Sequence, residues 1–349
     1  MERFDALQQL VPELEELLER RYNLLRVIRE SAPAGRRSIA ARLDSSERVV
    51  RSEIDLLRAQ GLVNCSAAGV WLSPRGEEVL YKVQSFVRQL HDLAYLEKVL
   101  APVLGVSRLI IVPGDADDNP NGQADLAMAA ARFLYETLGD GDVLGVTGGT
   151  TLAKVAESFA VFDGERKVTV VPVRGGLGED VKIQASTIAA RLAENMGGSY
   201  RLLHAPEDVR PRYLEQILNE PRIRDVIALG RRADVLLHGI GTAEEMAKRR
   251  GIDEATIMQL IADGAVGEAF GCYFNTNGDI VYNTASVGLR LEDLERIPLV
   301  VAVGGGRSKA WAVMSVLARG YCDVCITDEG VARRVMSLKE KEIKEGEKE

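Results

Sequence analysis

The stretch Val143-Leu-Gly-Val-Thr-Gly-Gly-Thr-Thr151 decides the fold of the larger part of this chain. Its apolar first half is typical of a buried strand, and the segment after Thr151 has the apolar spacing of a helix. Glycines let backbone N–H groups approach an anion closely, and a helix start carries partial positive charge. The stretch therefore predicts a strand, a phosphate-binding turn and a helix. A tight turn capped by threonine is the alternative that the residues leave open.

From about residue 105 onward, apolar strands alternate with amphipathic helices. This alternation predicts a Rossmann-like, doubly wound α/β domain with a mainly parallel sheet, in which ligands bind at the carboxyl ends of the strands. The expected strands are 108–112, 142–146, 168–173, 235–239, 299–304 and 323–326, and the expected helices include 126–138, 152–160, 188–196 and 310–317.

A second glycine loop, Val303-Gly-Gly-Gly-Arg-Ser-Lys309, also lies between an apolar strand and an apolar-striped helix. Backbone donors at Gly305 and Gly306, beside the point charge of Lys309, indicate a second anion site. Two such loops fit a ligand with two phosphates, or with one phosphate and a polar sugar. Ordinary turn geometry with a surface lysine is the alternative here.

Three more side chains are candidates for the same crevice. Arg174 follows the expected strand 168–173, Gln184 begins a helical pattern, and Glu268 lies in the stretch Ala-Val-Gly-Glu-Ala-Phe. A guanidinium suits phosphate, whereas an amide or a carboxylate can hydrogen-bond to sugar hydroxyl groups.

Residues 33–72 have the order of a winged helix-turn-helix. A short apolar helix around Ile39 is followed by the cap Asp44-Ser-Ser-Glu47, by a second helix with Val50, Ile54 and Leu57 facing inward, and by a hairpin pattern over 61–72.

The outward face of the second helix is polar and rich in arginine, as suits the major groove of DNA. The alternative is a solvated face whose arginines pair with Glu47, Glu53 and Asp55. The expected DNA contacts are Ser46, Arg48, Arg51, Ser52 and Arg58.

The domain organisation that these patterns predict has four parts. Residues 1–78 form the winged helix-turn-helix with an N-terminal helix, whose apolar stripe from Leu7 packs within its own domain or mediates self-association. Residues 79–104 form a connecting helix, which covers the next domain or pairs with a second copy. Residues 105–337 form the effector domain, and the charged segment 338–349 is expected to be frayed.

The charge and composition of the chain limit how it could bind DNA and where it could act. The formal net charge of -8 requires that any DNA contact come from a locally basic face. Four cysteines, no leader and no apolar run of about 20 residues favour a cytoplasmic protein without a membrane span. The pair Cys322 and Cys325 is interpreted as packing, and the scattered histidines give no metal spacing. We therefore expect no catalytic residue, no metal and no cofactor.

Taken together, these motifs identify the chain as similar to the SorC family of sugar-responsive transcriptional regulators. The resemblance is carried by residues 24–80, 145–151, 171–178, 267–268 and 304–309. It implies a repressor of glycolytic genes that assembles as a tetramer on operator DNA, whereas the patterns alone leave a dimer or tetramer open. It also implies an effector domain akin to sugar-phosphate isomerases, with fructose-1,6-bisphosphate as the effector.

The resemblance also implies roles for individual residues. Gly149, Thr150 and Thr151 hold one phosphate, while Lys309 and either Arg249 or Arg250 lie near the other. The full expected effector set is Gly148, Gly149, Thr150, Thr151, Arg174, Gln184, Arg250, Glu268, Gly305, Gly306 and Lys309. The alternative is a sugar-phosphate isomerase or deaminase fused to a DNA-binding domain, with Glu268 or Asp234 as its general base.

Overall fold

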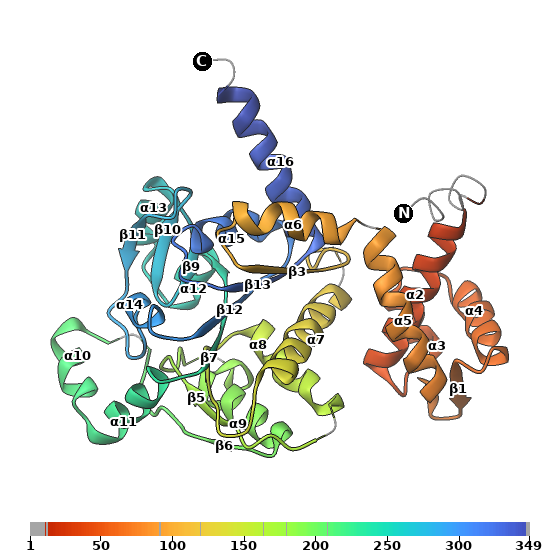
Figure 1. The fold of residues 1–349 in the computed structure, drawn as a ribbon, viewed down its shortest axis with the longest axis horizontal. Helices are drawn as coiled ribbons and strands as arrows, with labels where there is room; N and C mark the ends of the chain where they lie inside the picture. The colour runs from red at the N-terminus through yellow and green to blue at the C-terminus, as the bar shows by residue number, and fades with distance from the viewer. Residues whose placement is uncertain are drawn as a thin grey trace. The chain divides into compact units, whose positions relative to one another are not determined.

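A computed structural model describes residues 11, 13–90, 92–118, 120–162, 164–178, 180–207 and 209–346. The chain forms two compact units that divide between Ala94 and Tyr95, and each is described by itself (Figure 1). The start of the expected N-terminal stripe, including Leu7, lies outside the described residues.

The N-terminal unit is a winged helix-turn-helix, as predicted. Its core gathers apolar side chains from every helix, with Ile28, Ile39 and Ile54 fully buried. Ser46 caps the second helix of the motif, because its hydroxyl accepts a hydrogen bond from the Val49 N–H at 3.3 Å. The elements are α2 (Glu13–Ser31), α3 (Arg36–Arg42), α4 (Glu47–Ala59), β1 (Val63–Ser66), β2 (Gly69–Leu72) and α5 (Pro74–Leu90).

The connecting helix expected over 79–104 is two helices. The first, α5, ends at Leu90, and α6 spans Leu93–Val103. Asp92 between them has a φ of 51°, in the left-handed region, where a right-handed helix cannot continue. The division between the two units falls just after this interruption.

The larger unit is built on a seven-stranded parallel sheet in the order β3-β13-β12-β7-β4-β5-β6. All six predicted strands are present, with ends shifted by at most two residues, and β6 is an addition. From β4 the chain proceeds to β5 and β6 on one side, and then returns to β7 on the other side of β4. This reversal opens a crevice at the carboxyl ends of β4 and β7. The strands are β3 (Arg108–Val112), β4 (Val143–Val146), β5 (Thr169–Pro172), β6 (Ser199–Tyr200), β7 (Val235–Gly239), β12 (Leu299–Val303) and β13 (Val324–Asp328).

Helices cover this sheet, and α7, α8 and α9 share one continuous core with its strands. Because β7 and β13 are almost completely buried, their sequences are mainly apolar and do not alternate between apolar and polar residues. The helix α16 extends to Gly346, so the segment from residue 338 that we expected to be frayed is helical up to that point. The helices are α7 (Pro120–Thr137), α8 (Thr150–Ser158), α9 (Ala185–Met196), α10 (Pro211–Leu218), α11 (Pro221–Gly230), α14 (Leu291–Leu294), α15 (Ala310–Leu317) and α16 (Glu329–Gly346), with 3₁₀ turns η1 (Phe159–Val161), η2 (Val181–Ile183) and η3 (Arg307–Lys309).

A small antiparallel sheet, in the order β11-β10-β9-β8, was not predicted. Its strands are short, and one turn places Phe270 and Gly271 at positive φ. The sheet and the first of its two helices border the crevice. The elements are β8 (Gly241–Thr242), α12 (Ala243–Arg249), α13 (Glu254–Ala262), β9 (Ala265–Ala269), β10 (Cys272–Asn275) and β11 (Ile280–Asn283). Within the described ranges, no helix has the length and apolar character needed to cross a membrane.

Candidate functional site

A pocket occupies the crevice at the carboxyl ends of β4 and β7. Its walls come from the segment after β4, the end of β7, the start of α9, the end of α12 and strand β9. The pocket brings together nine of the residues expected from the sequence, which are Gly148, Gly149, Thr150, Thr151, Arg174, Gln184, Arg250, Glu268 and Lys309.

The first glycine loop presents an open helix start to this pocket. Gly149 has a φ of 130°, which favours glycine, and its own N–H donates to the Ile183 carbonyl at 2.9 Å. The first hydrogen bond within α8 runs from Ala153 N–H to the Gly149 carbonyl at 3.0 Å. The N–H groups of residues 150–152 therefore precede the helical ladder, and no described residue accepts from them. Such donors at the positive end of a helix dipole form an anion site.

The second glycine loop is closed by carboxylates of the protein itself. The Gly306 N–H donates to Asp328 at 2.6 Å, Arg307 N–H to Asp115 at 3.1 Å, and Ser308 N–H to Asp117 at 2.8 Å. Gly305 and Gly306, which the sequence analysis expected to bind the ligand, do not line the pocket, and the Gly306 N–H is taken by Asp328. These hydrogen bonds hold the residues immediately before Lys309 in place. Lys309 itself lines the pocket.

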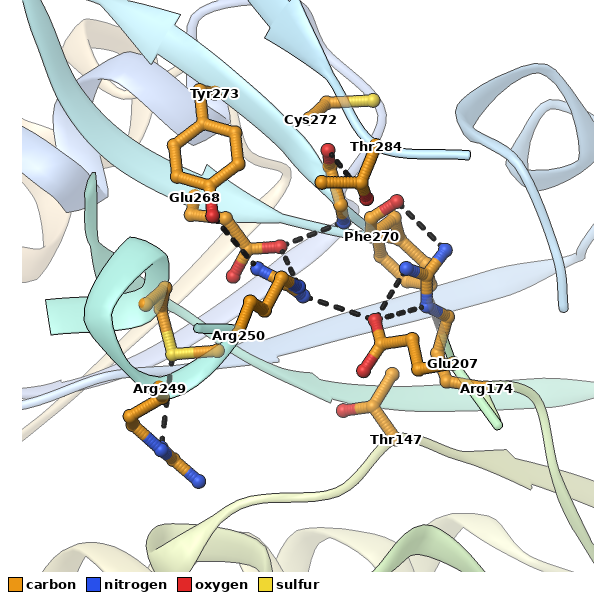
Figure 2. A network of polar contacts seen from close by, with 12 residues as sticks. Thr147, Arg174, Glu207, Arg249, Arg250, Glu268, Phe270, Cys272, Tyr273 and Thr284 are labelled. Atoms are coloured by element: carbon orange, nitrogen blue, oxygen red, sulfur yellow. Dashed lines mark hydrogen bonds and ion pairs between the residues drawn. The ribbon is translucent and has the colours of Figure 1, made fainter. Parts of the chain in front are cut away.

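Four charged side chains that line the pocket form a buried series of ion pairs. We call Arg174, Glu207, Arg250 and Glu268 the buried quartet (Figure 2). Arg174 pairs with Glu207, whose Oε1 also lies 2.9 Å from Arg250 Nη2, and this same nitrogen lies 2.9 Å from Glu268 Oε1. Each of these side chains is at most 6% exposed. The two positive and two negative charges balance, so the quartet attracts anions weakly as a group.

Backbone and ring contacts hold the quartet in place. Arg174 Nη1 donates to the Phe270 carbonyl at 2.7 Å, Arg250 Nη1 donates to the Tyr273 hydroxyl at 3.3 Å, and the Gly271 N–H donates to Glu268 Oε1 at 2.6 Å. Burial by itself would raise the pKa of Glu207, but the two guanidinium groups outweigh it and hold that pKa below its usual value. Glu207 is therefore ionised at neutral pH.

The structure separates the two adjacent arginines that the sequence left ambiguous. Arg250 is committed to the buried quartet and is 3% exposed. Arg249 leaves α12 in another direction, donates to Met246 Sδ at 3.7 Å, and also lines the pocket (Figure 2). Consecutive residues on a helix project about 100° apart, which explains the divergence.

His238 lines the pocket as a neutral group. It is 1% exposed, and its Nε2 lies 3.2 Å from Cys322 Sγ. Burial lowers the pKa of His238 to about 4, against a hydrogen bond with the Gly239 carbonyl that favours the charged form. Burial also raises the pKa of Cys325 to about 12, consistent with a packing role for this cysteine. Within the described ranges, no group of His, Cys, Asp and Glu side chains has the arrangement of a metal site.

The structure places the two candidate general bases of the enzyme alternative in different surroundings. One oxygen of Glu268 is held by Arg250 and the Gly271 N–H. Asp234 precedes β7, at the amino end of the strand and away from the pocket, and its carboxylate accepts from the Val143 N–H at 2.8 Å. Asp234 therefore lies outside the pocket, and Glu268 has one of its carboxylate oxygens already engaged.

Glu207 is a pocket residue that the sequence analysis missed. It lies in an irregular segment between β6 and α10 that has no motif, and only the fold brings it to the two arginines. Its backbone is anchored as well, because its N–H donates to the Gly176 carbonyl and its carbonyl accepts from Val287 N–H, both at 2.9 Å.

In the N-terminal unit, the outward face of α4 retains unpaired arginines. The acids beside them pair elsewhere: Glu47 with Arg37, Glu53 with Arg20 and Arg21, and Asp55 with Arg36. Arg48, Arg51 and Arg58 are exposed, and no described carboxylate pairs with them. The alternative of a face neutralised by its own acids therefore does not hold for these three residues.

Comparison with known proteins gives the same division of the chain. Residues 17–87 match a family model described as the CggR N-terminal DNA binding domain, and residues 88–337 match one described as a sugar-binding domain. The chain is 38% identical to the central glycolytic genes regulator of Bacillus subtilis over 95% of its own length and 97% of that protein.

Solved structures resemble the larger unit in particular. A SorC family transcriptional regulator from Enterococcus faecalis is 35% identical, with a TM-score of 0.63 over 69% of this chain and 99% of that one. The full-length sorbitol operon regulator SorC from Klebsiella pneumoniae is 17% identical, with a TM-score of 0.65 over 86% of this chain and 93% of that one, and shows the shared fold.

Proposed function

The chain belongs to the SorC family of transcriptional regulators, with a DNA-binding domain and a sugar-binding domain, and we propose that it represses central glycolytic genes under the control of fructose-1,6-bisphosphate. The open start of α8 in the pocket supports this proposal most directly. Its unused N–H groups and the hydroxyl groups of Thr150 and Thr151 suit one phosphate.

The second phosphate lies near Arg249 and Lys309 in this proposal. Both side chains line the pocket, and neither belongs to the buried quartet. We therefore assign this role to Arg249 in place of Arg250, the residue favoured from the sequence. Gln184 and Glu268 remain for the hydroxyl groups of the sugar.

The DNA contacts in this proposal come from α4. Ser46, Arg48, Arg51, Ser52 and Arg58 are exposed on or beside its outward face. A homodimer or tetramer would present two or more such helices to a palindromic or repeated operator. The effector controls DNA binding only if it binds the free and the DNA-bound forms with different affinity, and a hundredfold change corresponds to about 2.7 kcal/mol.

Thermal unfolding of the full chain with a panel of sugar phosphates tests the proposal. A ligand at 100 times its dissociation constant stabilises its domain by about 2.7 kcal/mol. We expect fructose-1,6-bisphosphate to raise the melting temperature more than fructose 6-phosphate, fructose or inorganic phosphate does. If no sugar phosphate stabilised the protein, the proposed effector site would be refuted.

A further inference from the structure

Glu207 uses only one of its two carboxylate oxygens within the protein. Arg174 Nε donates to Oε1 at 2.9 Å, Arg174 Nη2 also donates to Oε1, and Arg250 Nη2 donates to it at 2.9 Å. No described group donates to Oε2. An ionised carboxylate has about four acceptor positions, so a side chain that is 6% exposed is left with unused capacity.

The unused oxygen belongs to a residue of the pocket wall. Glu207 lines the pocket, and its second oxygen points away from both arginines (Figure 2). Because the backbone of Glu207 is tied to Gly176 and Val287, and its Oε1 to two guanidinium groups, this oxygen is held in a fixed direction.

Glu268 repeats this arrangement on strand β9. Its Oε1 accepts from Arg250 and from the Gly271 N–H, whereas its Oε2 has no described donor. The pocket wall thus carries two carboxylate acceptors from distant parts of the chain, both supported by Arg250. A carboxylate repels phosphate but accepts a hydrogen bond from a hydroxyl group, so this wall suits the uncharged part of a sugar phosphate.

We infer that Glu207 is a further ligand-binding residue, whose Oε2 accepts a hydrogen bond from a sugar hydroxyl group and so selects a polyhydroxylated anion over a bare one. This inference rests on the proposed function, because it specifies how the same pocket recognises the sugar. Hydrogen bonds to charged groups contribute about 1.5–3 kcal/mol, which corresponds to a ten- to hundredfold preference.

The test compares two bisphosphates by calorimetry in the full-length protein. Fructose-1,6-bisphosphate carries hydroxyl groups, and 1,6-hexanediol bisphosphate carries two phosphates without them. The variant Glu207→Gln keeps one acceptor for the arginines but presents an NH₂ donor in place of Oε2. We expect the ratio of affinities, fructose-1,6-bisphosphate over hexanediol bisphosphate, to fall ten- to hundredfold.

The ratio separates hydroxyl recognition from charge and from structural damage. Removing a negative charge strengthens both bisphosphates together, and a loosened wall weakens both together, so neither effect changes the ratio. Glu244→Gln is the matched control, because Glu244 is an exposed carboxylate of α12 that pairs with Lys248 and does not line the pocket, and its ratio should equal that of the unmodified protein. Glu207→Asp, which keeps the charge but withdraws the carboxylate by one methylene, should lower the ratio even if the glutamine variant fails to fold.

An unchanged ratio in the folded Glu207 variants would overturn the inference while leaving the proposed function intact. Absence of fructose-1,6-bisphosphate binding to the unmodified protein would instead refute the proposed function, and the inference with it.

Discussion

The two glycine loops of the larger unit have similar sequences and similar backbones but opposite surroundings. Each joins an apolar strand to a helical turn, and Gly149 and Gly306 both have positive φ, at 130° and 97°. The N–H groups after Gly149 border the pocket and have no acceptor among the described residues, whereas those from Gly306 to Ser308 donate to three aspartates. A glycine loop therefore predicts that backbone N–H groups are accessible as donors. Whether a ligand can bind to these N–H groups depends on the residues that face the loop.

Closing the open loop should have the largest effect. Thr151→Asp places a carboxylate at the start of α8, where it imitates the aspartates of the other loop. The helix dipole favours an acid there, so stability should be kept or should rise slightly. Affinity for fructose-1,6-bisphosphate should fall more than a hundredfold by calorimetry, or about 2.7 kcal/mol, because the carboxylate occupies the donors and repels the phosphate.

Thr151→Val is the control for this change, since it removes the hydroxyl group at nearly constant volume. It should weaken binding by only about tenfold, the size of one hydrogen bond. Normal binding by Thr151→Asp would place the phosphate somewhere other than the start of α8.

Removing Lys309 or Arg249 from the pocket wall should have an intermediate effect. Lys309→Met and Arg249→Met should each lower affinity for fructose-1,6-bisphosphate by about ten- to hundredfold, the size of a charge-assisted contact. The bisphosphate should then lose much of its advantage over fructose 6-phosphate in competition titrations.

Lys248→Met supplies the matched control, because Lys248 is an exposed cation of α12 that pairs with Glu244. It should leave both affinities unchanged. If Lys309→Met and Arg249→Met bound both sugars as the unmodified protein does, the second phosphate would not lie at this wall.

Opening the closed loop should have the smallest effect on effector affinity. It should lower the stability of the protein instead. Asp117→Ala frees the Ser308 N–H, which donates to Asp117 at 2.8 Å. The free energy of unfolding in urea should fall by about 1 kcal/mol, as for the loss of a helix cap. Affinity for fructose-1,6-bisphosphate should change by less than about threefold, or ~0.6 kcal/mol, because these donors face away from the pocket.

Asp118→Ala is the comparison variant, since Asp118 pairs with the exposed side chain of Arg307 at 2.6 Å. It should alter stability by less than about 0.5 kcal/mol. A large loss of effector binding in Asp117→Ala would mean that the two loops act as one site.

The sequence predicted the parallel sheet well because its strands are buried on both faces and flanked by helical periodicity. It did not predict the antiparallel sheet, because polar residues such as Glu268 and Asn275 interrupt the apolar residues of β9 and β10, and β11 is mostly exposed. The winged helix-turn-helix was recognisable from local features alone, namely the capping stretch 44–47, in which the structure makes Ser46 the cap, the apolar positions of α4 and the hairpin.

The residues of the candidate site that belong to a local sequence motif could be predicted. The residues that the fold brings together from distant parts of the chain could not. Adjacent glycines and threonines made the loop before α8 recognisable as an anion site. The closure of the other loop depends on Asp115 and Asp117, about 190 residues earlier in the chain, and local spacing gives no sign of it. Glu207 has no motif, and the choice between Arg249 and Arg250 depends on the exact end of a helix.

The central claim is that an anion at the start of α8 controls DNA binding by a separate unit. Fluorescence anisotropy of a duplex selected from random DNA by the full-length protein measures this directly, with and without saturating fructose-1,6-bisphosphate. Arg51→Ala serves as a control that should weaken DNA binding and its salt dependence while leaving effector affinity unchanged. We predict that the effector changes DNA affinity at least tenfold in the unmodified protein, about 1.4 kcal/mol, and not in Thr151→Asp. An unchanged DNA affinity in the unmodified protein, or an equal response in Thr151→Asp, would contradict the account.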